Sequence, residues 1–203
     1  MSSDTVELLS PADHLRDSLL DCMRAVARQH HPAYTRADFS WQADEPLRRR
    51  MTAFAVDEGV SRRVSVVAVC NGSVIGYILC ADYVARDVNH YWDDLRAAAR
   101  LGNAEGAAYT AFKAQLEQTW RRAQTEVVPP GKVMFGITAG VLPEYGRGGL
   151  FRRLYDEVVR RGAEHGFEWY CGLNVNTGAW FAFCHVLLLC EPDGCLLFLC
   201  RSQ

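Results

Sequence analysis

The 203-residue sequence predicts a single α/β domain. Apolar runs of strand length alternate with segments in which apolar residues recur at helical spacing. Two of the apolar runs are joined by Asn71-Gly72, a dipeptide that strongly indicates a two-residue β-hairpin. A third run, residues 132–141, ends in a glycine-rich turn and a helical pattern follows directly. No internal repeat, low-complexity tract or linker interrupts the chain, so we expect one core.

The N-terminal part of the chain predicts one strand followed by two helices. Residues 5–9 alternate between apolar and polar side chains, as a half-buried strand does. Ser10-Pro11 is typical of a helix start, with serine as the cap and proline at the first helical position. This helix is expected to run to about Gln29, and a second helix from Glu45 to Gly59.

The rest of the chain predicts more strands, two further helices and one long insertion. The insertion, from about residue 82 to residue 131, is helical in pattern. The helices are expected at residues 149–165 and 176–185, and the strands at 64–70, 73–81, 132–141, 168–175, 186–190 and 195–201.

Composition and charge exclude several classes of protein. The 22 basic and 24 acidic side chains nearly cancel, so no broad positive field favours nucleic acid as a partner. No segment approaches the roughly 20 apolar residues of a membrane span, and no apolar signal run opens the chain. The eight cysteines include no Cys-x-x-Cys pair and predict free thiols rather than a zinc site. We therefore expect a soluble cytoplasmic protein without a bound metal.

The turn after residue 141 is the strongest functional signal. It reads Gly146-Arg147-Gly148-Gly149 and is followed at once by a helix. The N-terminus of a helix presents backbone N–H groups to an anion, and glycines let a phosphate approach the backbone. The turn lacks the Gly-Lys-Ser/Thr of a P-loop and the complete Gly-x-Gly-x-x-Gly of a dinucleotide site. The alternative is a strand–turn–helix corner that binds no ligand.

This turn and its flanks resemble the acetyl-CoA motif of the Gcn5-related N-acetyltransferases, usually Arg/Gln-x-x-Gly-x-Gly/Ala. The similarity includes Pro143-Glu144-Tyr145 before the glycines and the apolar helix after them. Gly149 matches the first required glycine of the motif. Gly146 stands where Arg or Gln is usual, and Phe151 stands where Gly or Ala is usual. The order of the predicted elements also fits this family over nearly the whole chain.

The resemblance implies a mixed, mostly antiparallel sheet flanked by helices and splayed at the strand that binds the cofactor. Acetyl-CoA is then the expected cofactor, and its pantetheine arm should bond the backbone in the splay. The residues implied for the pantetheine arm are Thr138, Ala139, Gly140 and Val141. Those implied for the diphosphate are Gly146, Arg147, Gly148, Gly149, Leu150, Phe151 and Arg152.

A second stretch resembles the family's Asn-x-x-Ala-x-x-x-Tyr segment, which also contacts the cofactor. Here it runs from Asn176 to Phe183. The family's tyrosine at the last position donates a proton to the leaving thiolate, and phenylalanine has no proton to donate. The resemblance therefore implies a transfer without that tyrosine.

Asp44-Glu45-Pro46-Leu47 resembles a segment of the arylalkylamine (dopamine-type) N-acetyltransferases, in which the glutamate is the catalytic base. That branch also has a long insertion between its third and fourth strands. Glu45 is thus the candidate base. Alternatively, Asp44 caps the second helix and Glu45 stabilises its first turn, which is compatible with catalysis.

The resemblance predicts transfer of an acetyl group to a small primary amine by direct attack in a ternary complex. His31, Tyr34 and Trp41 fall where this family shapes its acceptor site, although packing alone also explains aromatic residues there. Two alternatives remain: a non-catalytic module that binds acyl-CoA or a protein partner, and acetylation of a protein N-terminus or lysine. The protein is expected to be a monomer or homodimer.

Overall fold

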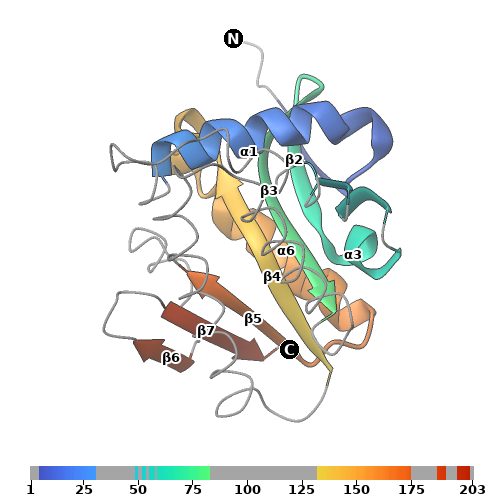
Figure 1. Ribbon diagram of the computed structural model, residues 1–203, viewed down its shortest axis with the longest axis vertical. Helices are drawn as coiled ribbons and strands as arrows, with labels where there is room; N and C mark the ends of the chain where they lie inside the picture. The colour runs from blue at the N-terminus through green and yellow to red at the C-terminus, as the bar shows by residue number, and fades with distance from the viewer. Residues whose placement is uncertain are drawn as a thin grey trace, which may run out of the picture.

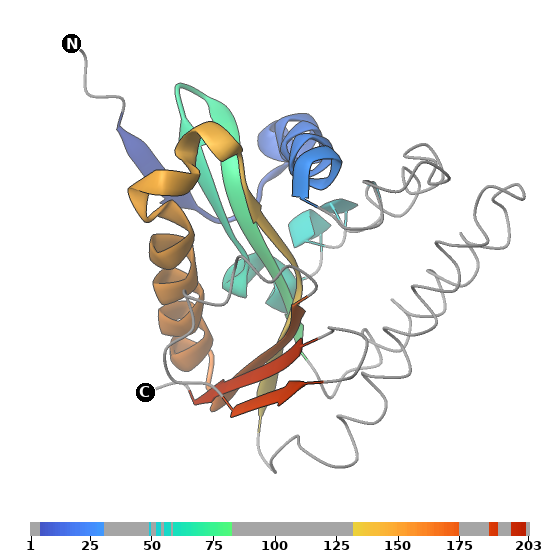
Figure 2. The same cartoon turned by 90° about the vertical axis from the view of Figure 1, so that its left-hand side faces the viewer.

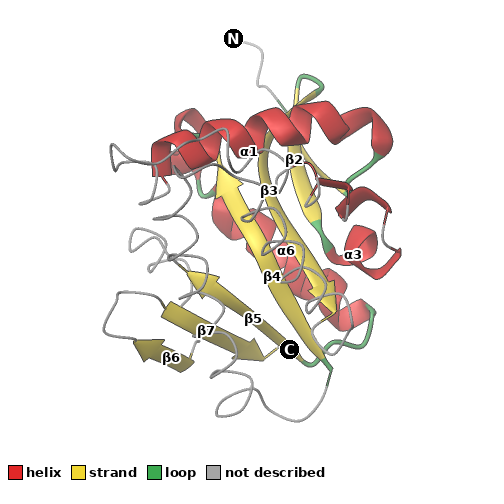
Figure 3. Ribbon diagram, in the orientation of Figure 1, coloured by secondary structure: helices red, strands yellow, loops and turns green. Residues whose placement is uncertain are grey.

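The computed structural model describes residues 5–30, 49, 52–53, 55–57, 59–82, 132–174, 187–190 and 196–201. Within these residues the strands form a seven-stranded sheet in the order β1-β2-β3-β4-β5-β7-β6 (Figures 1 and 3). Neighbouring described strands are antiparallel except β4 and β5, which are parallel. The elements are β1 Val6–Leu9, α1 Arg16–His30, α3 Gly59–Val64, β2 Val66–Cys70, β3 Ser73–Asp82, β4 Val133–Val141, α6 Leu150–Glu164, β5 Trp169–Asn174, β6 Leu187–Cys190 and β7 Leu196–Arg201.

Helices cover both faces of the sheet (Figure 2). α1 packs on β3 and β4 from one side, whereas α6 packs on β2, β3 and β4 from the other. All five residues of β2 are buried, as expected of a strand with a helix layer on each face. This arrangement confirms the predicted mixed, mostly antiparallel α/β fold.

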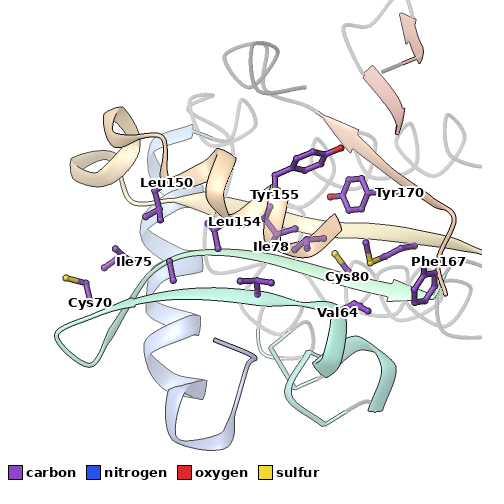
Figure 4. Packing of buried hydrophobic residues seen from close by; sticks show 14 residues of the cluster. Val64, Cys70, Ile75, Ile78, Cys80, Leu150, Leu154, Tyr155, Phe167 and Tyr170 are labelled. Atoms are coloured by element: carbon purple, nitrogen blue, oxygen red, sulfur yellow. The ribbon is translucent and has the colours of Figure 1, made fainter. Parts of the chain in front are cut away.

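The core between α6 and the sheet is a continuous apolar cluster (Figure 4). α6 contributes residues at helical spacing, including Leu150, Leu154 and Val158. Alternate residues of β2 and three residues of β3 meet them from the sheet. The cluster members are Val64, Val66, Ala68, Cys70, Ile75, Ile78, Cys80, Met134, Leu150, Leu154, Tyr155, Val158, Phe167 and Tyr170. The position of the α6 N-terminus is therefore set by tight packing along the helix.

The predicted hairpin between β2 and β3 is confirmed. Cys70 pairs with Ser73, and the two residues between them have positive φ, 50° at Asn71 and 76° at Gly72. Positive φ at both central residues defines the type I′ turn, whose twist matches that of the flanking strands. The hairpin thus follows from the dipeptide itself.

The first helix does not start where the sequence predicts. A short 3-10 helix, Asp13–Leu15, precedes α1, and Ala12 is its N-cap residue. Ser10 is not a cap, because its hydroxyl accepts a hydrogen bond of 2.8 Å from Arg161 Nη1 on α6. A tertiary contact therefore engages the side chain that was predicted to cap the helix.

The second correction concerns the strand expected from residue 64. Residues 59–64 continue the helical region as α3, and β2 begins only at Val66. Ser65 Oγ accepts a 2.9 Å hydrogen bond from the Cys80 N–H, and the Ser61 hydroxyl donates to the Cys80 carbonyl. Because these hydroxyls bond the backbone of β3, the chain beside Cys80 does not need to be a strand.

Gly140 lies where α1 crosses β4, and its lack of a side chain allows the close approach. A Cβ at this position would be 2.4 Å from Val26 Cγ1 and 3.2 Å from the hydroxyl of Tyr77. Gly140→Ala should therefore push α1 away from the sheet and lower the free energy of unfolding by about 1–3 kcal/mol. Thermal denaturation would show this as a fall of roughly 2–4 °C per kcal/mol.

Two variants control this prediction. Gly59→Ala should leave the stability nearly unchanged, because nothing lies within 4 Å of a Cβ at Gly59. Val26→Ala removes the clashing methyl groups, so the double variant should be less destabilised than the sum of the single changes. Additive effects at Gly140 and Val26 would contradict the proposed contact.

Glu157 on α6 is held by two arginines. It accepts hydrogen bonds of 2.7 and 2.8 Å from Arg160 and one of 2.8 Å from Arg161. These contacts lower the pKa of Glu157 from 4.5 to about 2. The hydrogen bonds from Arg160 are the largest cause, and Arg161 lowers the pKa further. A lowered pKa stabilises the fold above the unfolded-state pKa, and this stability is lost as the pH falls from 4.5 towards 2.

Glu157→Gln is therefore expected to lower the free energy of unfolding at pH 7 by about 1 kcal/mol, since solvent screens the partly exposed pairs. The difference from the wild type should shrink on acidification from pH 4.5 to pH 2, as urea denaturation at a series of pH values would show. Glu168→Gln removes an exposed carboxylate and is the control. A difference that persists at pH 2 would exclude this linkage.

Candidate functional site

The corner between β4 and α6 is built from a short helix and a left-handed glycine. Leu142 follows β4, and its N–H donates to the Ile75 carbonyl at 2.9 Å, which fixes the end of the strand beside β3. Residues Pro143–Gly148 form a 3-10 helix where the sequence predicted a glycine turn. Gly149 follows with φ 71° and ψ 12°, a conformation that strongly favours glycine. α6 then starts at Leu150, one residue later than predicted.

The space beside the three glycines of this corner is open. A Cβ placed on Gly146, Gly148 or Gly149 would meet no heavy atom within 4 Å, and all three residues are exposed. Only Gly149 needs glycine for its backbone conformation. Open space at the other two fits the close approach of a ligand to the backbone, as the sequence predicted.

The charges around the corner suit an anion. The first turn of α6 contains no acidic residue, so nothing there opposes a negative ligand at the positive end of the helix. Arg147 and Arg152 are exposed, and Arg152 also pairs with Asp156 at 2.8 Å. Arg153 is directed elsewhere, because its Nη2 donates to the Val6 carbonyl at 3.3 Å. Arg147 and Arg152 are therefore the exposed arginines that remain at this corner, and their role in binding a phosphate stays a prediction.

The side chains of Leu150 and Phe151 pack into the core and do not face the corner. Leu150 is 4% exposed and belongs to the core cluster, and Phe151 packs partly buried against it. Their side chains therefore hold α6 on the sheet. Only their backbone groups, in the first turn of the helix, point toward the site predicted for the diphosphate.

β4 and β5 diverge, and this divergence leads to the corner. They pair only from Val133↔Trp169 to Gly136↔Gly172. Beyond that point the described β5 residues pair with β7, and residues 138–141 of β4 pair with β3 (Figure 1). Over residues 137–141 the edge of β4 that faces away from β3 has no partner strand in the described part of the chain. We call this stretch the β4 edge.

The β4 edge presents backbone groups over about 13 Å, at about 3.3 Å per residue. Alternate residues of a strand direct their N–H and C=O groups to the same edge, so residues within 137–141 offer donors and acceptors away from β3. The predicted pantetheine residues Thr138, Ala139, Gly140 and Val141 all belong to this stretch. These four residues therefore lie on one strand edge that leads directly to the glycine corner.

The side chains along the β4 edge have separate structural roles. Gly140 allows α1 to approach, as described above, and Val141 packs against the α6 core. Ala139 is exposed. Any hydrogen bond that Ala139, Gly140 or Val141 makes to a ligand therefore comes from the backbone.

Several candidate residues lie outside the described part of the chain. These are the candidate base Glu45, the acceptor-site residues His31, Tyr34 and Trp41, the cofactor residues Asn176 and Phe183, and the insertion over residues 83–131. Their roles stay predictions.

Tyr170, which the sequence analysis did not single out, lies close to the β4 edge. It lies on β5 beside the point where the strands part, and its hydroxyl is 2.2 Å from the position that a Cβ on Gly136 would take. The pairing of β4 with β5 brings these two residues together, and that pairing cannot be read from either segment alone.

The buried cysteines are not candidate nucleophiles. Cys22, Cys70, Cys80 and Cys171 are free and buried, which confirms the expectation of free thiols for these four. Burial raises the pKa of Cys22 to about 12, with a smaller contribution from the charge of Glu144, and raises the pKa of Cys80 and Cys171 as well. Thiols with a raised pKa are protonated at neutral pH and react slowly.

Two further expectations concern metals and membranes. No cluster of three or more His, Cys, Asp or Glu side chains suited to a metal ion occurs within the described ranges. In the same part of the chain, none of the helices has the length and apolarity needed to cross a bilayer.

Comparison with known proteins identifies the fold. No protein-family model matches the sequence, and no curated protein matches it either. Solved structures match over nearly the whole chain, and they include acetyltransferases of the Gcn5-related (GNAT) superfamily. The chain therefore has the GNAT fold, and the resemblance seen in the sequence is confirmed at the level of the fold.

Three of these structures show the range of the similarity. Arylalkylamine N-acetyltransferase 2 from Aedes aegypti has a TM-score of 0.71 and 13% identity, covering 98% of this chain and 100% of that chain. The polyamine N-acetyltransferase of Drosophila melanogaster, which forms N-acetylagmatine, has a TM-score of 0.65 and 14% identity, covering 97% and 100%. The PaiA N-acetyltransferase of Thermoplasma acidophilum in complex with coenzyme A has a TM-score of 0.57 and 9% identity, covering 97% and 99%.

Proposed function

We propose that this protein is an acetyl-CoA-dependent N-acetyltransferase that acts on a small primary amine. The observation that carries the proposal is the divergence of β4 from β5, which leaves the β4 edge without a partner strand in the described part of the chain and leads to the glycine corner. The solved structures with this fold include enzymes named for polyamine and arylalkylamine acceptors, which supports an amine as the acceptor.

The described residues fit coenzyme A in two ways. The pantetheine arm contains two amides, which can bond to the β4 edge as an added strand would. The diphosphate is matched by the open space at Gly146 and Gly148, the positive end of α6 and the exposed Arg147 and Arg152. The amides of the pantetheine arm thus have backbone hydrogen-bonding groups beside them, and the diphosphate has positive charge beside it.

In the proposed reaction the amine attacks directly in a ternary complex. When bound, acetyl-CoA supplies the acetyl group as a thioester. A primary amine is mostly protonated at pH 7 and cannot attack in that form, so Glu45 takes the proton as the general base. Phe183 has no proton to return to the sulfur, which therefore receives one from the ammonium product or from water.

The acceptor amine is proposed to be bound by residues of the segment after α1. His31 can hydrogen-bond the amine or relay its proton, and Tyr34 and Trp41 can line the site with aromatic surface. Such a lining would favour aryl or other apolar amines.

Two measurements test the proposal. A thermal-shift comparison should show stabilisation by acetyl-CoA and by free coenzyme A but not by NAD, by about 2.7 kcal/mol at a hundred times the dissociation constant. Release of the coenzyme A thiol should then depend on an added amine, screened among aryl amines, polyamines and aminoglycosides.

The outcomes separate the candidate functions. Stabilisation with amine-dependent thiol release supports the transferase. Stabilisation without release for any amine favours the non-catalytic acyl-CoA-binding module, which is motivated by the departures from the family's motifs at Gly146, Phe151 and Phe183. No stabilisation by either thioester or thiol would overturn both functions.

A further inference from the structure

The point where β4 and β5 part is flanked by two glycines. Gly136 and Gly172 form the last pair of the β4–β5 ladder. The pair two residues earlier, Met134 and Tyr170, lies on the α6 face of the sheet, and both side chains belong to the core cluster. Because side chains alternate along a strand, the glycine pair lies on that same face. The two glycines place no side chain on the α6 face, so the space above them must be filled by a neighbouring residue.

Tyr170 fills that position. Its hydroxyl oxygen and Cζ lie 2.2 and 2.9 Å from the place that a Cβ on Gly136 would occupy. Tyr170 is 3% exposed, and its ring forms a T-shaped contact with the ring of Tyr155 from α6, with centroids 5.5 Å apart and planes at 87° (Figure 4). The phenol is therefore held over Gly136 from β5 and from α6 together.

The opposite face of the sheet is also closed at this level. Phe135 and Cys171 form the neighbouring pair of the ladder, and they are 2% and 0% exposed. Side chains are therefore tightly packed on both faces of the sheet at this end of the ladder, where β4 and β5 begin to diverge. A ligand that lies along the β4 edge from the corner would meet this end.

The length of the pantetheine arm brings the acyl group to that end. The arm from the diphosphate to the sulfur has about thirteen bonds, and a chain with three bonds per residue spans about 14 Å over that number. From Val141 back to Gly136, one residue beyond the β4 edge, β4 spans about 16 Å. With the diphosphate at the corner, the sulfur reaches about residue 137 or 138, and the acyl carbons continue toward Gly136.

We propose that Tyr170 is the residue that limits the length of the acyl group, by closing the space above Gly136 with its phenol. This inference rests on the proposed function and adds to it the acyl specificity. An acetyl group is short enough to end before it reaches the phenol of Tyr170. The additional methylene groups of propionyl or butyryl would clash with the phenol. The contact between Tyr170 and the acyl group is purely steric, so Tyr170 takes no part in proton transfer.

The test is the dissociation constant of a series of acyl thioesters, measured by calorimetry on acetyl-, propionyl-, butyryl- and hexanoyl-CoA. Wild-type protein should bind acetyl-CoA best and butyryl-CoA at least tenfold more weakly. Tyr170→Phe removes the oxygen nearest Gly136 and should shift the limit to propionyl. Tyr170→Ala removes the ring and should admit the longer chains, with a gain of roughly fourfold in affinity for each methylene accommodated.

Tyr77 offers a matched control on the other face of β4. Its phenol lies 3.2 Å from the Cβ position of Gly140 and is 2% exposed, so it resembles Tyr170 in burial and in its approach to a glycine. Tyr77→Phe and Tyr77→Ala should weaken all four thioesters equally or leave them unchanged. The conservative Tyr170→Phe keeps the test valid if the alanine variant fails to fold.

Three results would contradict the inference. The first is a wild-type protein that binds all chain lengths equally well. The second is a Tyr170→Phe profile identical to the wild type, with acetyl-CoA still bound; in that case the proposed function stands and only the role of Tyr170 is lost. The third is a wild-type protein that binds no thioester, which would overturn the proposed function and this inference together.

Discussion

Glu45→Gln is expected to lower turnover by a factor of roughly 10² to 10⁴ while leaving the affinity for coenzyme A unchanged. A primary amine with a pKa near 10 is neutral in only about 0.1% of molecules at pH 7, so a base that removes its proton at the site governs the rate. Glutamine keeps the size of the side chain and cannot take the proton. The measurement is amine-dependent release of the thiol, together with calorimetry of coenzyme A binding.

The pH dependence separates a base from a capping residue. Without the base, only the neutral amine in solution reacts, so turnover of the Gln variant should rise about tenfold per pH unit up to the amine pKa. The wild type should level off at a lower pH. If Glu45 only stabilises the first turn of a helix, its loss should cost about 0.3–1 kcal/mol of stability and leave the pH profile as it is.

Asp44→Asn is the matched control for Glu45, because it removes the neighbouring carboxylate of the same segment. Asparagine caps a helix about as well as aspartate, so both helix stability and turnover should be retained. Equal losses of turnover in the two variants would contradict a specific role for Glu45.

Gly148→Asp is expected to weaken coenzyme A binding at least a hundredfold without unfolding the protein. Nothing lies within 4 Å of a Cβ at this position, and the residue is exposed, so the fold tolerates a side chain. A carboxylate about 4 Å from a phosphate is repelled by about 4 kcal/mol at an effective dielectric constant of about 20. Calorimetric titration with coenzyme A checks the prediction.

The stability of the same variant should stay the same or rise slightly. A carboxylate at the N-terminus of α6 interacts favourably with the helix dipole, by about 0.3–1 kcal/mol. Gly148→Asn, which adds similar bulk without charge, should weaken binding much less. Gly59→Asp, at another open position, should not affect binding. If the Gly148→Asp variant binds coenzyme A like the wild type, the diphosphate must lie elsewhere.

The local features of the fold were predicted well because short stretches of sequence encode them. Asn71-Gly72 forms the type I′ turn between β2 and β3, since both residues tolerate positive φ. The strand before the glycines and the helix after them were placed within one residue, because apolar periodicity changes sharply at the corner. The corner of the candidate site was therefore visible in the sequence.

The errors occurred where a distant partner decides the local structure. Ser10 is a typical cap residue, but Arg161, which lies far along the chain, engages its hydroxyl. Residues 59–64 are helical, and Ser61 and Ser65 supply to Cys80 the hydrogen bonds that a longer β2 would have made. In both places tertiary hydrogen bonds outweigh weak local preferences.

The sequence alone determined the alternation of strands and helices, the hairpin and the glycine corner at the start of α6, because each depends on backbone preferences of neighbouring residues. The tertiary structure decided where β4 parts from β5 and which side chain closes that point. Tyr170 and Gly136 lie far apart in the sequence, and only the parallel pairing of their strands brings the phenol over the glycine. Contacts of this kind depend on the register between segments, which no local pattern contains.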